Sequence, residues 1–271
     1  MPYTEITSRK NRIILEASCL CVDKKARDKS GLFPAEGIKL LEEALICGLK
    51  VDKLFFTQKA LDLYINTIER TECAQKFLVT DEVYAKLSDE SAPQGIFACI
   101  EKPVCGNLSD EELACGDFVL LEDVQNPLNI GAILRCCYSM GFEIVVFSKG
   151  CAVIYNPKCV RAGMGSLFKI TPFFSDNMPE LALRIANAGN RVFCTCLNKN
   201  SLILGDISFK PGDCFAIGNE GHGVSESLMK SCSDSLIIPM NSGAESLNAA
   251  TAAAIVMWEM KKNTLCNKTD I

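Results

Sequence analysis

The sequence predicts an α/β protein whose second half carries a parallel sheet with helices on both faces. Short, almost continuously apolar runs recur after residue 117: FVLLEDV, EIVVF, RVFCTCL, CFAIG and SLIIPM. They are separated by helical patterns near 130–140, 177–189, 224–231 and 246–262. Buried parallel strands have this continuous apolar character because both of their faces are covered. The first half shows a looser alternation of the same two patterns.

The first half is expected to form a smaller α/β layer. EGIKLLEEALICGL has apolar residues at helical spacing and ends at Gly48, a residue suited to a helix C-terminus. Strand-like DKLFFT, KFLVT and GIFACIE follow, with helical stretches between them. A polar stretch with proline and glycine then predicts a linker at 105–115, which joins a domain over 1–104 to one over 116–266.

Composition places the chain among globular proteins. Its 271 residues are 48% hydrophobic and 23% charged, which is enough apolar content for a sizeable core and argues against disorder. No apolar run approaches the roughly 20 residues that span a bilayer. The N-terminal MPYTEITSRKNRIILEAS lacks the apolar core of a signal peptide, so we expect a cytoplasmic protein.

The sixteen cysteines are scattered through strand and helix patterns, and no two have CxxC spacing. The only histidine is His222. Zinc sites need paired thiolates at short spacing or histidine partners, so we expect no metal. Reduced and mostly buried thiols are the favoured interpretation, ahead of disulfides.

The net charge of −5 argues, by itself, against a nucleic-acid partner, because phosphate contacts need lysine and arginine. The first thirty residues differ, with seven basic against four acidic residues. The basic ones are Arg9, Lys10, Arg12, Lys24, Lys25, Arg27 and Lys29. Two interpretations of this segment remain open: a charged face exposed to solvent, and a basic surface that binds RNA.

Three polar loops follow strand ends and form the candidate site. The first leads into a helix with Asn129 and Arg135, the second is AIGNEGHGVSE, and the third is IIPMNSGAESLN. Ligands of parallel sheets bind outside the carboxyl ends of the strands, so these loops are expected to converge. Simpler interpretations stay open: an ion pair or solvent-reaching side chain for Arg135, an ordinary glycine turn, and a helix N-cap for Ser246.

Two nucleotide-binding motifs are excluded. Gly218, Gly221 and Gly223 occur in the order GxxGxG and not GxGxxG, and the strand lacks the expected acidic residue about twenty positions further on. The phosphate-binding pattern GxxxxGK[ST] does not occur.

Four blocks, in this order, carry a family resemblance: NPLNIGAILRCCYSMGF, NPKCVRAGMGSLF, AIGNEGHGVSE and IIPMNSGAESLNAATAAAIVMWE. Over residues 116–262 they resemble the signature of the SpoU-type (TrmH-like) RNA 2′-O-ribose methyltransferases of the SPOUT superfamily. The first half, with LFPAEGIKLLEEAL and KLFFT, resembles the RNA-recognition domain that often precedes this catalytic domain. The fold of that domain is similar to that of a small ribosomal protein.

The resemblance implies a catalytic domain whose C-terminal segment forms a deep trefoil knot, a homodimer, S-adenosylmethionine as cofactor and a ribose of RNA as substrate. Ribosomal RNA is favoured over transfer RNA because of the N-terminal domain. A catalytically silent RNA-binding protein that keeps the knot is the alternative. A third interpretation, a nicotinamide-linked oxidoreductase, is supported by the fold class alone.

The resemblance also implies roles for particular residues. Cofactor binding falls to Gly218, Ile238 and Leu247, with Asn219, Glu220, Pro239, Ser246 and Asn248 beside them. Asn129 and Arg135 match the catalytic motif that faces the ribose. Since a guanidinium is almost never deprotonated at neutral pH, orienting the hydroxyl and stabilising the developing alkoxide is at least as plausible for Arg135 as general-base catalysis.

The second block leaves its own roles open. Lys158 and Arg161 match the block and are expected either to contact RNA phosphates or to serve a structural purpose. Gly163 stands where the family commonly has serine, which weakens any role for that position.

Overall fold

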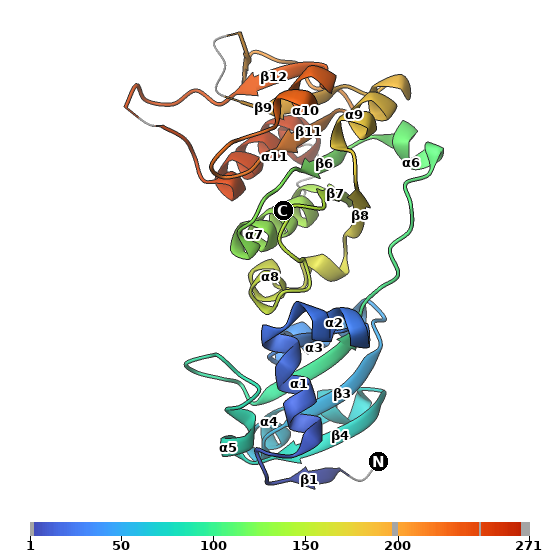
Figure 1. The fold of residues 1–271 in the computed structure, drawn as a ribbon, viewed down its shortest axis with the longest axis vertical. Coiled ribbons are helices and arrows are strands. Elements are labelled where there is room, and N and C mark those ends of the chain that lie inside the picture. Colours follow the sequence, from blue (N-terminus) through green and yellow to red (C-terminus); the bar gives the residue numbers. More distant parts are fainter. Residues whose placement is uncertain (1–2, 197–199, 244, 267–271) are drawn as a thin grey trace. The chain divides into compact units, whose positions relative to one another are not determined.

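The structure, a computed structural model, describes residues 3–196, 200–243 and 245–266. The chain forms two compact units, one of Met1–Val104 with Val153–Phe168 and one of Cys105–Ala152 with Lys169–Ile271. Each unit has its own sheet (Figure 1). Across the described ranges, no helix combines the length and apolarity that crossing a membrane demands.

The first unit is built on a mixed five-stranded sheet with the order β1-β4-β3-β5-β2. β1 and β3 pair in parallel with β4, whereas β5 runs antiparallel to β3 and β2. The strands are β1 (Thr4–Ile6), β2 (Leu32–Glu36), β3 (Val51–Phe56), β4 (Cys73–Val79) and β5 (Ile96–Glu101). The helices are α1 (Arg12–Val22), α2 (Lys24–Ser30), α3 (Ile38–Ile46), α4 (Gln58–Arg70), α5 (Asp81–Tyr84), α8 (Pro157–Gly163) and the 3-10 turn η1 (Ser166–Phe168).

The elements expected in this half are present. The predicted helix is α3, and Gly48 follows its C-cap in the left-handed conformation, with φ of 68°. The three predicted strands are β3, β4 and β5. Their aromatic residues Phe55, Phe77 and Phe97 lie together in a core with Ile14 of α1, because alternate strand positions face that helix.

The predicted linker contains a short helix, α6 (Asp110–Cys115). Its first turn is held by a capping box: Ser109 accepts from the backbone N–H of Glu112, and Glu112 accepts from that of Ser109. The S-x-x-E signal was in the sequence and outweighs the polar composition that suggested an irregular segment.

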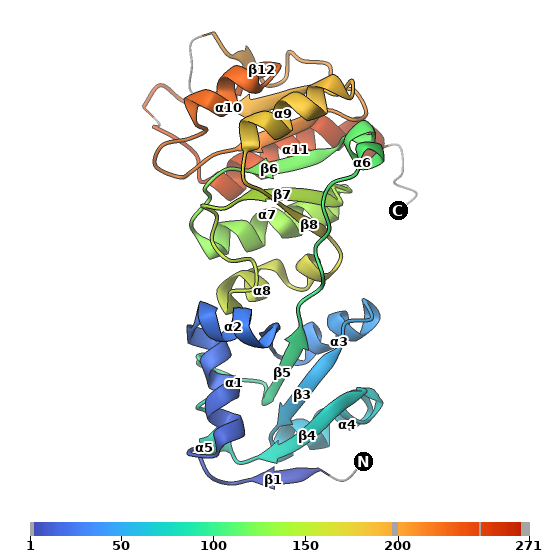
Figure 2. The same ribbon diagram turned by 45° about the vertical axis from the view of Figure 1, so that its right-hand side comes forward.

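The second unit carries a seven-stranded sheet with the order β10-β12-β9-β11-β6-β7-β8, in which every pair of neighbours is parallel. Its strands β6, β7 and β8 lie side by side in Figure 2. This confirms the predicted parallel sheet. The strands are β6 (Phe118–Leu121), β7 (Ile144–Ser148), β8 (Thr171–Ser175), β9 (Val192–Thr195), β10 (Leu202–Ile203), β11 (Cys214–Ile217) and β12 (Asp234–Ile237). The helices are α6, α7 (Pro127–Met140), α9 (Met178–Asn187), α10 (Glu226–Ser231) and α11 (Ala249–Cys266).

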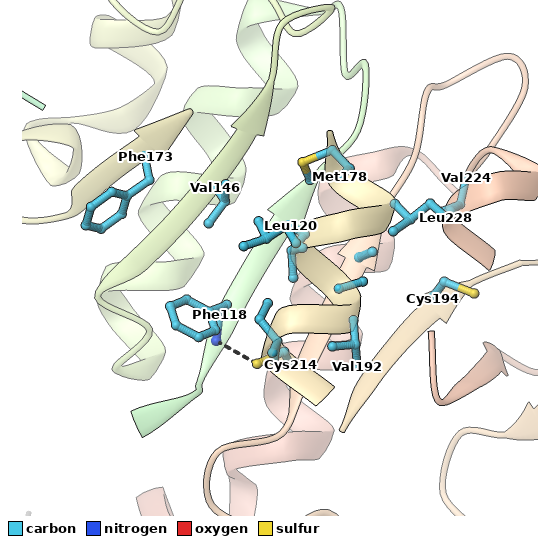
Figure 3. Packing of buried hydrophobic residues seen from close by; sticks show 14 of the residues in the cluster. Phe118, Leu120, Val146, Phe173, Met178, Val192, Cys194, Cys214, Val224 and Leu228 are labelled. Atoms are coloured by element: carbon cyan, nitrogen blue, oxygen red, sulfur yellow. Dashed lines mark hydrogen bonds between the residues drawn. The ribbon is translucent and has the colours of Figure 1, made fainter. Parts of the chain in front are cut away.

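Helices cover both faces of this sheet. On one face, Phe118 and Leu120 of β6 pack with Met178 of α9 and Leu228 of α10 (Figure 3). On the other, α7 and α11 pack against each other, and α11 contacts β11. All four residues of β6 are fully buried, which explains why this strand is apolar at every position.

None of the sixteen cysteines, all of which lie in the described ranges, takes part in a disulfide. Five are buried, namely Cys99, Cys137, Cys159, Cys194 and Cys214. Burial raises the pKa of Cys159 and of Cys214 to about 12, so both are neutral at physiological pH. Within the part of the chain that the structure describes, no three His, Cys, Asp or Glu side chains gather as metal ligands would.

Candidate active site

The loops after β11 and β12 enclose a cavity of about 750 Å³ at the carboxyl edge of the second sheet. Seven of the eight residues expected to bind the cofactor line it, namely Gly218, Asn219, Glu220, Ile238, Ser246, Leu247 and Asn248. Pro239 is exposed and does not line it. The volume lies in the range of cavities that hold cofactors and other small molecules.

The lining is apolar and acidic. Ile217, Met229 and Met240 supply apolar surface, and Glu220 and Glu245 supply two carboxylates. No lysine or arginine among the described residues lines the cavity. A cation therefore finds favourable charges here, whereas a ligand with several phosphates would face two carboxylates without a guanidinium or ammonium to balance its charge.

The loop after β11 closes on itself through its glycines. Asn219 and Gly223 exchange backbone hydrogen bonds, at 3.0 and 2.9 Å between N and O. A Cβ atom on Gly218 would lie 2.1 Å from the carbonyl carbon of Gly223, so only glycine allows this approach. Gly223 itself has φ of 70°, in the left-handed region. The loop is thus a defined turn, and its residues 218–224 line the cavity.

Glu220 joins this loop to the one after β6. Its carboxylate accepts from the backbone N–H groups of Gln125 and Asn126, both at 3.1 Å, and from Nδ2 of Asn129 at 2.9 Å. Beside it, Asn219 donates from Nδ2 to the carbonyl of Asp123 at 2.8 Å. Two adjacent side chains therefore connect the cavity to the start of α7.

Asn248 brings in the third loop. Its Oδ1 accepts from the backbone N–H groups of Ala250 and Thr251, which caps α11, and its Nδ2 donates to Oδ1 of Asn129 at 2.9 Å. The expectation that Ser246 is an ordinary N-cap is wrong, because the helix begins at Ala249. Asn129, with 7% of its surface exposed, thus lies between Glu220 and Asn248.

The hydrogen bonds govern the ionisation of Glu220. Partial burial acts to raise its pKa, but the donors of Asn129, Gln125 and Asn126 act in the opposite direction. The pKa of Glu220 consequently lies below its ordinary value, and the carboxylate is ionised at neutral pH.

Arg135 lies elsewhere on the same helix as Asn129. Six positions at about 100° each put it roughly 120° around α7 from Asn129. Its side chain is exposed, does not line the cavity and makes no ion pair or hydrogen bond with the described residues. The structure therefore brings Asn129 together with the cavity-lining residues and leaves Arg135 facing outward, beside the exposed Leu128 and Tyr138.

The second block lies in the first unit. Arg161 of α8 contacts carboxylate oxygens of Glu36, at 3.6 Å, and of Glu90, which supports the structural interpretation of this residue. Lys158 is exposed and forms no ion pair with the residues that the structure describes. Gly163 is the buried last residue of α8.

Several lining residues were not predicted from the sequence. Thr195 is the last residue of β9 and Cys196 follows it. Met229 comes from α10, and His222 and Glu245 lie in the loops already singled out. Thr195 and Cys196 lie near the end of the strand run RVFCTCL, and the rule that ligands bind at the carboxyl edges of parallel strands could have included them.

The comparisons with known proteins agree with this geometry. A family model described as the SpoU rRNA Methylase family matches residues 117–258, and one described as an MRM3-like substrate binding domain matches residues 20–98. The chain is 30% identical to the 23S rRNA (guanosine(2553)-2'-O)-methyltransferase RlmP of Bacillus subtilis, over 95% of this chain and 99% of that protein.

Two further relatives have the same extent. A 23S rRNA (uridine(2479)-2'-O)-methyltransferase of Streptomyces viridochromogenes is 27% identical, over 97% of this chain and 94% of its own length. The AdoMet-bound rRNA methyltransferase of Sinorhizobium meliloti superposes with a TM-score of 0.83 at 25% identity, covering 96% of this chain and 98% of that structure.

Proposed function

Because the chain belongs to the SpoU rRNA methylase family, which its match over residues 117–258 shows, we propose that it methylates a ribose 2′-hydroxyl of RNA with S-adenosylmethionine. Ribosomal RNA is the proposed substrate, since the relatives from Bacillus and Streptomyces both act on 23S rRNA. The observation that carries the proposal is the cavity that the loops after β11 and β12 enclose and that Glu220 and Asn129 connect to α7.

The cavity suits S-adenosylmethionine in size and charge. Its sulfonium and ammonium groups are cations, and the lining offers the carboxylates of Glu220 and Glu245. We propose that the backbone of Gly218, Ile238 and Leu247 holds this cofactor, with Asn219, Glu220, Ser246 and Asn248 shaping the pocket. When bound, S-adenosylmethionine would supply a methyl group attached to a positively charged sulfur. The ribose oxygen forms the new C–O bond and loses its proton, and the electron pair of the broken C–S bond stays on the sulfur.

The residues of the chain position the hydroxyl and balance its charge. Arg135 stays protonated, donates hydrogen bonds to the 2′-oxygen and stabilises the negative charge that develops on it. Asn129 fixes the start of α7 relative to the cavity of its own subunit through Glu220. Positioning of this kind supplies much of the rate when the methyl donor is already reactive.

Arg135 faces outward, so the proposed active site needs a second copy of the chain. Leu128 is 52% and Tyr138 47% exposed on α7 beside Arg135, and α11, which packs on α7, exposes 48% of Trp258. Large apolar side chains exposed on packed helices favour a protein interface. We propose a homodimer in which this surface is covered and Arg135 reaches the partner's cavity, with the family's trefoil knot in each subunit.

The first unit is proposed to bind the RNA, in line with the matched substrate-binding domain over residues 20–98. Arg9, Lys10, Lys24, Lys25 and Lys29 are exposed in its first thirty residues. They offer phosphate contacts that the overall charge of −5 does not suggest, since the local field matters more than the net charge. A cytoplasmic location is proposed with this substrate.

The competing functions fit less well. A silent RNA-binding protein has no need of a cavity whose Asn129, Glu220 and Asn248 form a complete hydrogen-bonded chain. A nicotinamide-linked oxidoreductase needs cations or a glycine fingerprint for its pyrophosphate, and neither accompanies this cavity among the described residues.

Two measurements test the proposal. Calorimetry should detect binding of S-adenosylmethionine to the full chain, which a silent RNA-binding protein would lack. Transfer of a labelled methyl group to rRNA from cells without the gene, followed by mapping of 2′-O-methyl sites, should yield one position that is unmodified in those cells. Cofactor binding without transfer to any rRNA or tRNA would contradict the proposed reaction.

A further inference from the structure

We propose that Glu122 is a positioning residue that holds both ends of the cofactor loop, residues 218–224, and thereby sets its affinity for S-adenosylmethionine. This inference rests on the proposed function of the same cavity. Glu122 does not line the cavity itself, and 8% of its surface is exposed. It would act through Ser225, the first residue after the loop.

The backbone of Glu122 holds the beginning of the loop. β6 and β11 pair in register, with Leu121 opposite Ile217. One residue further, the N–H of Glu122 donates to the carbonyl of Ile217 at 2.9 Å. The parallel ladder thus extends to the point where Gly218 turns away from the sheet.

The side chain of Glu122 holds the end of the loop. Oε2 accepts from the backbone N–H of Ser225 at 2.6 Å, and Oε1 accepts from its hydroxyl at 2.7 Å. Charge-assisted hydrogen bonds to a buried carboxylate are stronger than neutral ones. A single residue directly after β6 therefore fixes the separation of the two loop ends. This separation is critical because Gly218 and Gly223 approach each other so closely.

Ser225 also caps a helix, and an experiment must separate this role from its hydrogen bonds with Glu122. Its hydroxyl oxygen accepts from the backbone N–H of Leu228 at 3.2 Å and caps α10. Asparagine and aspartate both serve this capping task about as well as serine. They differ toward Glu122, because asparagine can donate a hydrogen bond to it, whereas aspartate places a second carboxylate against it.

The test compares Ser225→Asn with Ser225→Asp in the full chain. Titration calorimetry with S-adenosylhomocysteine, the demethylated product, measures affinity without turnover. Ser225→Asn should stay within about threefold of the wild-type Kd, and Ser225→Asp should weaken binding by about tenfold or more, since repulsion between buried carboxylates is large. Methyl transfer should show the same change as a raised KM for S-adenosylmethionine with a smaller change in kcat.

A compensating variant makes the test specific to Glu122. Glu122→Gln turns one carboxylate oxygen into a donor, so the double variant Glu122→Gln/Ser225→Asp should regain most of the lost affinity. Thermal denaturation of each variant identifies any that are unfolded. If Ser225→Asp is unfolded, the affinities of Ser225→Asn and of the double variant are compared instead. Equal affinity of Ser225→Asp and Ser225→Asn, or no recovery in the double variant, would overturn the inference. A wild-type chain that binds neither cofactor form would instead refute the proposed function.

Discussion

Nδ2 of Asn129 donates to the carboxylate of Glu220 at 2.9 Å, across 91 positions of sequence. The orientation of Asn129 is fixed from its other side, since its Oδ1 accepts from Nδ2 of Asn248. Asn248 is oriented in turn by α11, whose N–H groups bind its Oδ1. The cap of α11 therefore orients the amide of Asn248, and Asn248 orients the amide of Asn129. As a result, Asn129 presents Nδ2 and not Oδ1 to Glu220.

Asn248→Asp should break this chain without removing the cap. Aspartate caps helices as well as asparagine does, but its carboxylate would face Oδ1 of Asn129. Asn129 must then rotate its amide, which turns an oxygen toward Glu220. Leaving one such contact unsatisfied costs about 1–3 kcal/mol, so calorimetry should show cofactor affinity lower by about fivefold or more.

The matched control is Asn11→Asp. Asn11 also caps a helix through its side-chain oxygen, which accepts from Ile13 at 2.8 Å, but it lies in the first unit. Its exchange should leave cofactor affinity unchanged. Equal affinities for the Asn248→Asp variant and the wild type would show that the orientation of Asn129 does not matter.

The ionisation of Glu220 predicts how stability depends on pH. Its pKa in the folded chain is below the ordinary value of 4.5, so folding favours the charged form. The stabilisation is complete above the ordinary pKa and is lost as pH falls through the lowered one. The difference in unfolding free energy between wild type and Glu220→Gln should thus be constant from pH 8 to about 5.5 and shrink below about pH 4.5.

Denaturant titrations of both proteins across this range measure that difference. Because other carboxylates titrate in both proteins, their effects cancel in the comparison. A difference that grows on acidification would mean that Glu220 is protonated in the folded chain, and that the hydrogen bonds from Gln125 and Asn126 do not hold a carboxylate.

Gly218→Ala should open the loop that faces the cavity. The added Cβ would lie 2.1 Å from the carbonyl carbon of Gly223, and backbone at both sites must move. We expect a loss of about 1–3 kcal/mol in stability and a larger loss of cofactor affinity. Thermal denaturation and calorimetry measure the two effects separately.

Gly221→Ala is the control in the same loop. Its Cβ would have no closer neighbour than Oδ1 of Asn219 at 3.4 Å, an ordinary contact, so stability should change by less than about 0.5 kcal/mol. If both alanine variants are equally stable, the approach of Gly218 to Gly223 does not constrain the loop.

The sequence predicted elements best where burial makes the pattern uniform. β6, covered on both faces, is apolar at every position and was recognised. β8 was missed because Pro172 argues against a strand, although the strand lies at the sheet edge, where a missing N–H is tolerated. α8 was missed because seven residues give little periodicity, while Asn156 and Pro157 mark its start.

In the candidate site, too, some features could be predicted from the sequence and others could not. The convergence of the loops after β11 and β12 follows from strand direction, which a sequence pattern can indicate. The contacts of Glu122 with Ser225 and of Asn129 with Asn248 join residues 103 and 119 positions apart. They depend on strand order, which places β11 beside β6, and no local pattern encodes that order.

Arg135 gives the prediction that separates chemistry from cofactor binding. Because its side chain faces outward and does not line the cavity of its own subunit, its loss should leave that cavity intact. Arg135→Ala should lower methyl transfer by about 100-fold or more, the usual cost of removing a donor that stabilises an oxyanion. Affinity for S-adenosylmethionine should fall only a little, by about threefold or less.

Arg135→Lys and Arg184→Ala complete this comparison. Lysine keeps the charge but loses the planar fork of donors, so its turnover should lie between those of wild type and the alanine variant. Arg184 is an exposed arginine of α9 that lies 3.8 Å from Asp110, and its loss should leave turnover unchanged. If Arg135→Ala turns over at the wild-type rate, the guanidinium does not reach the ribose in either subunit. If it loses cofactor affinity as strongly as turnover, Arg135 holds the cofactor and does not act on the hydroxyl.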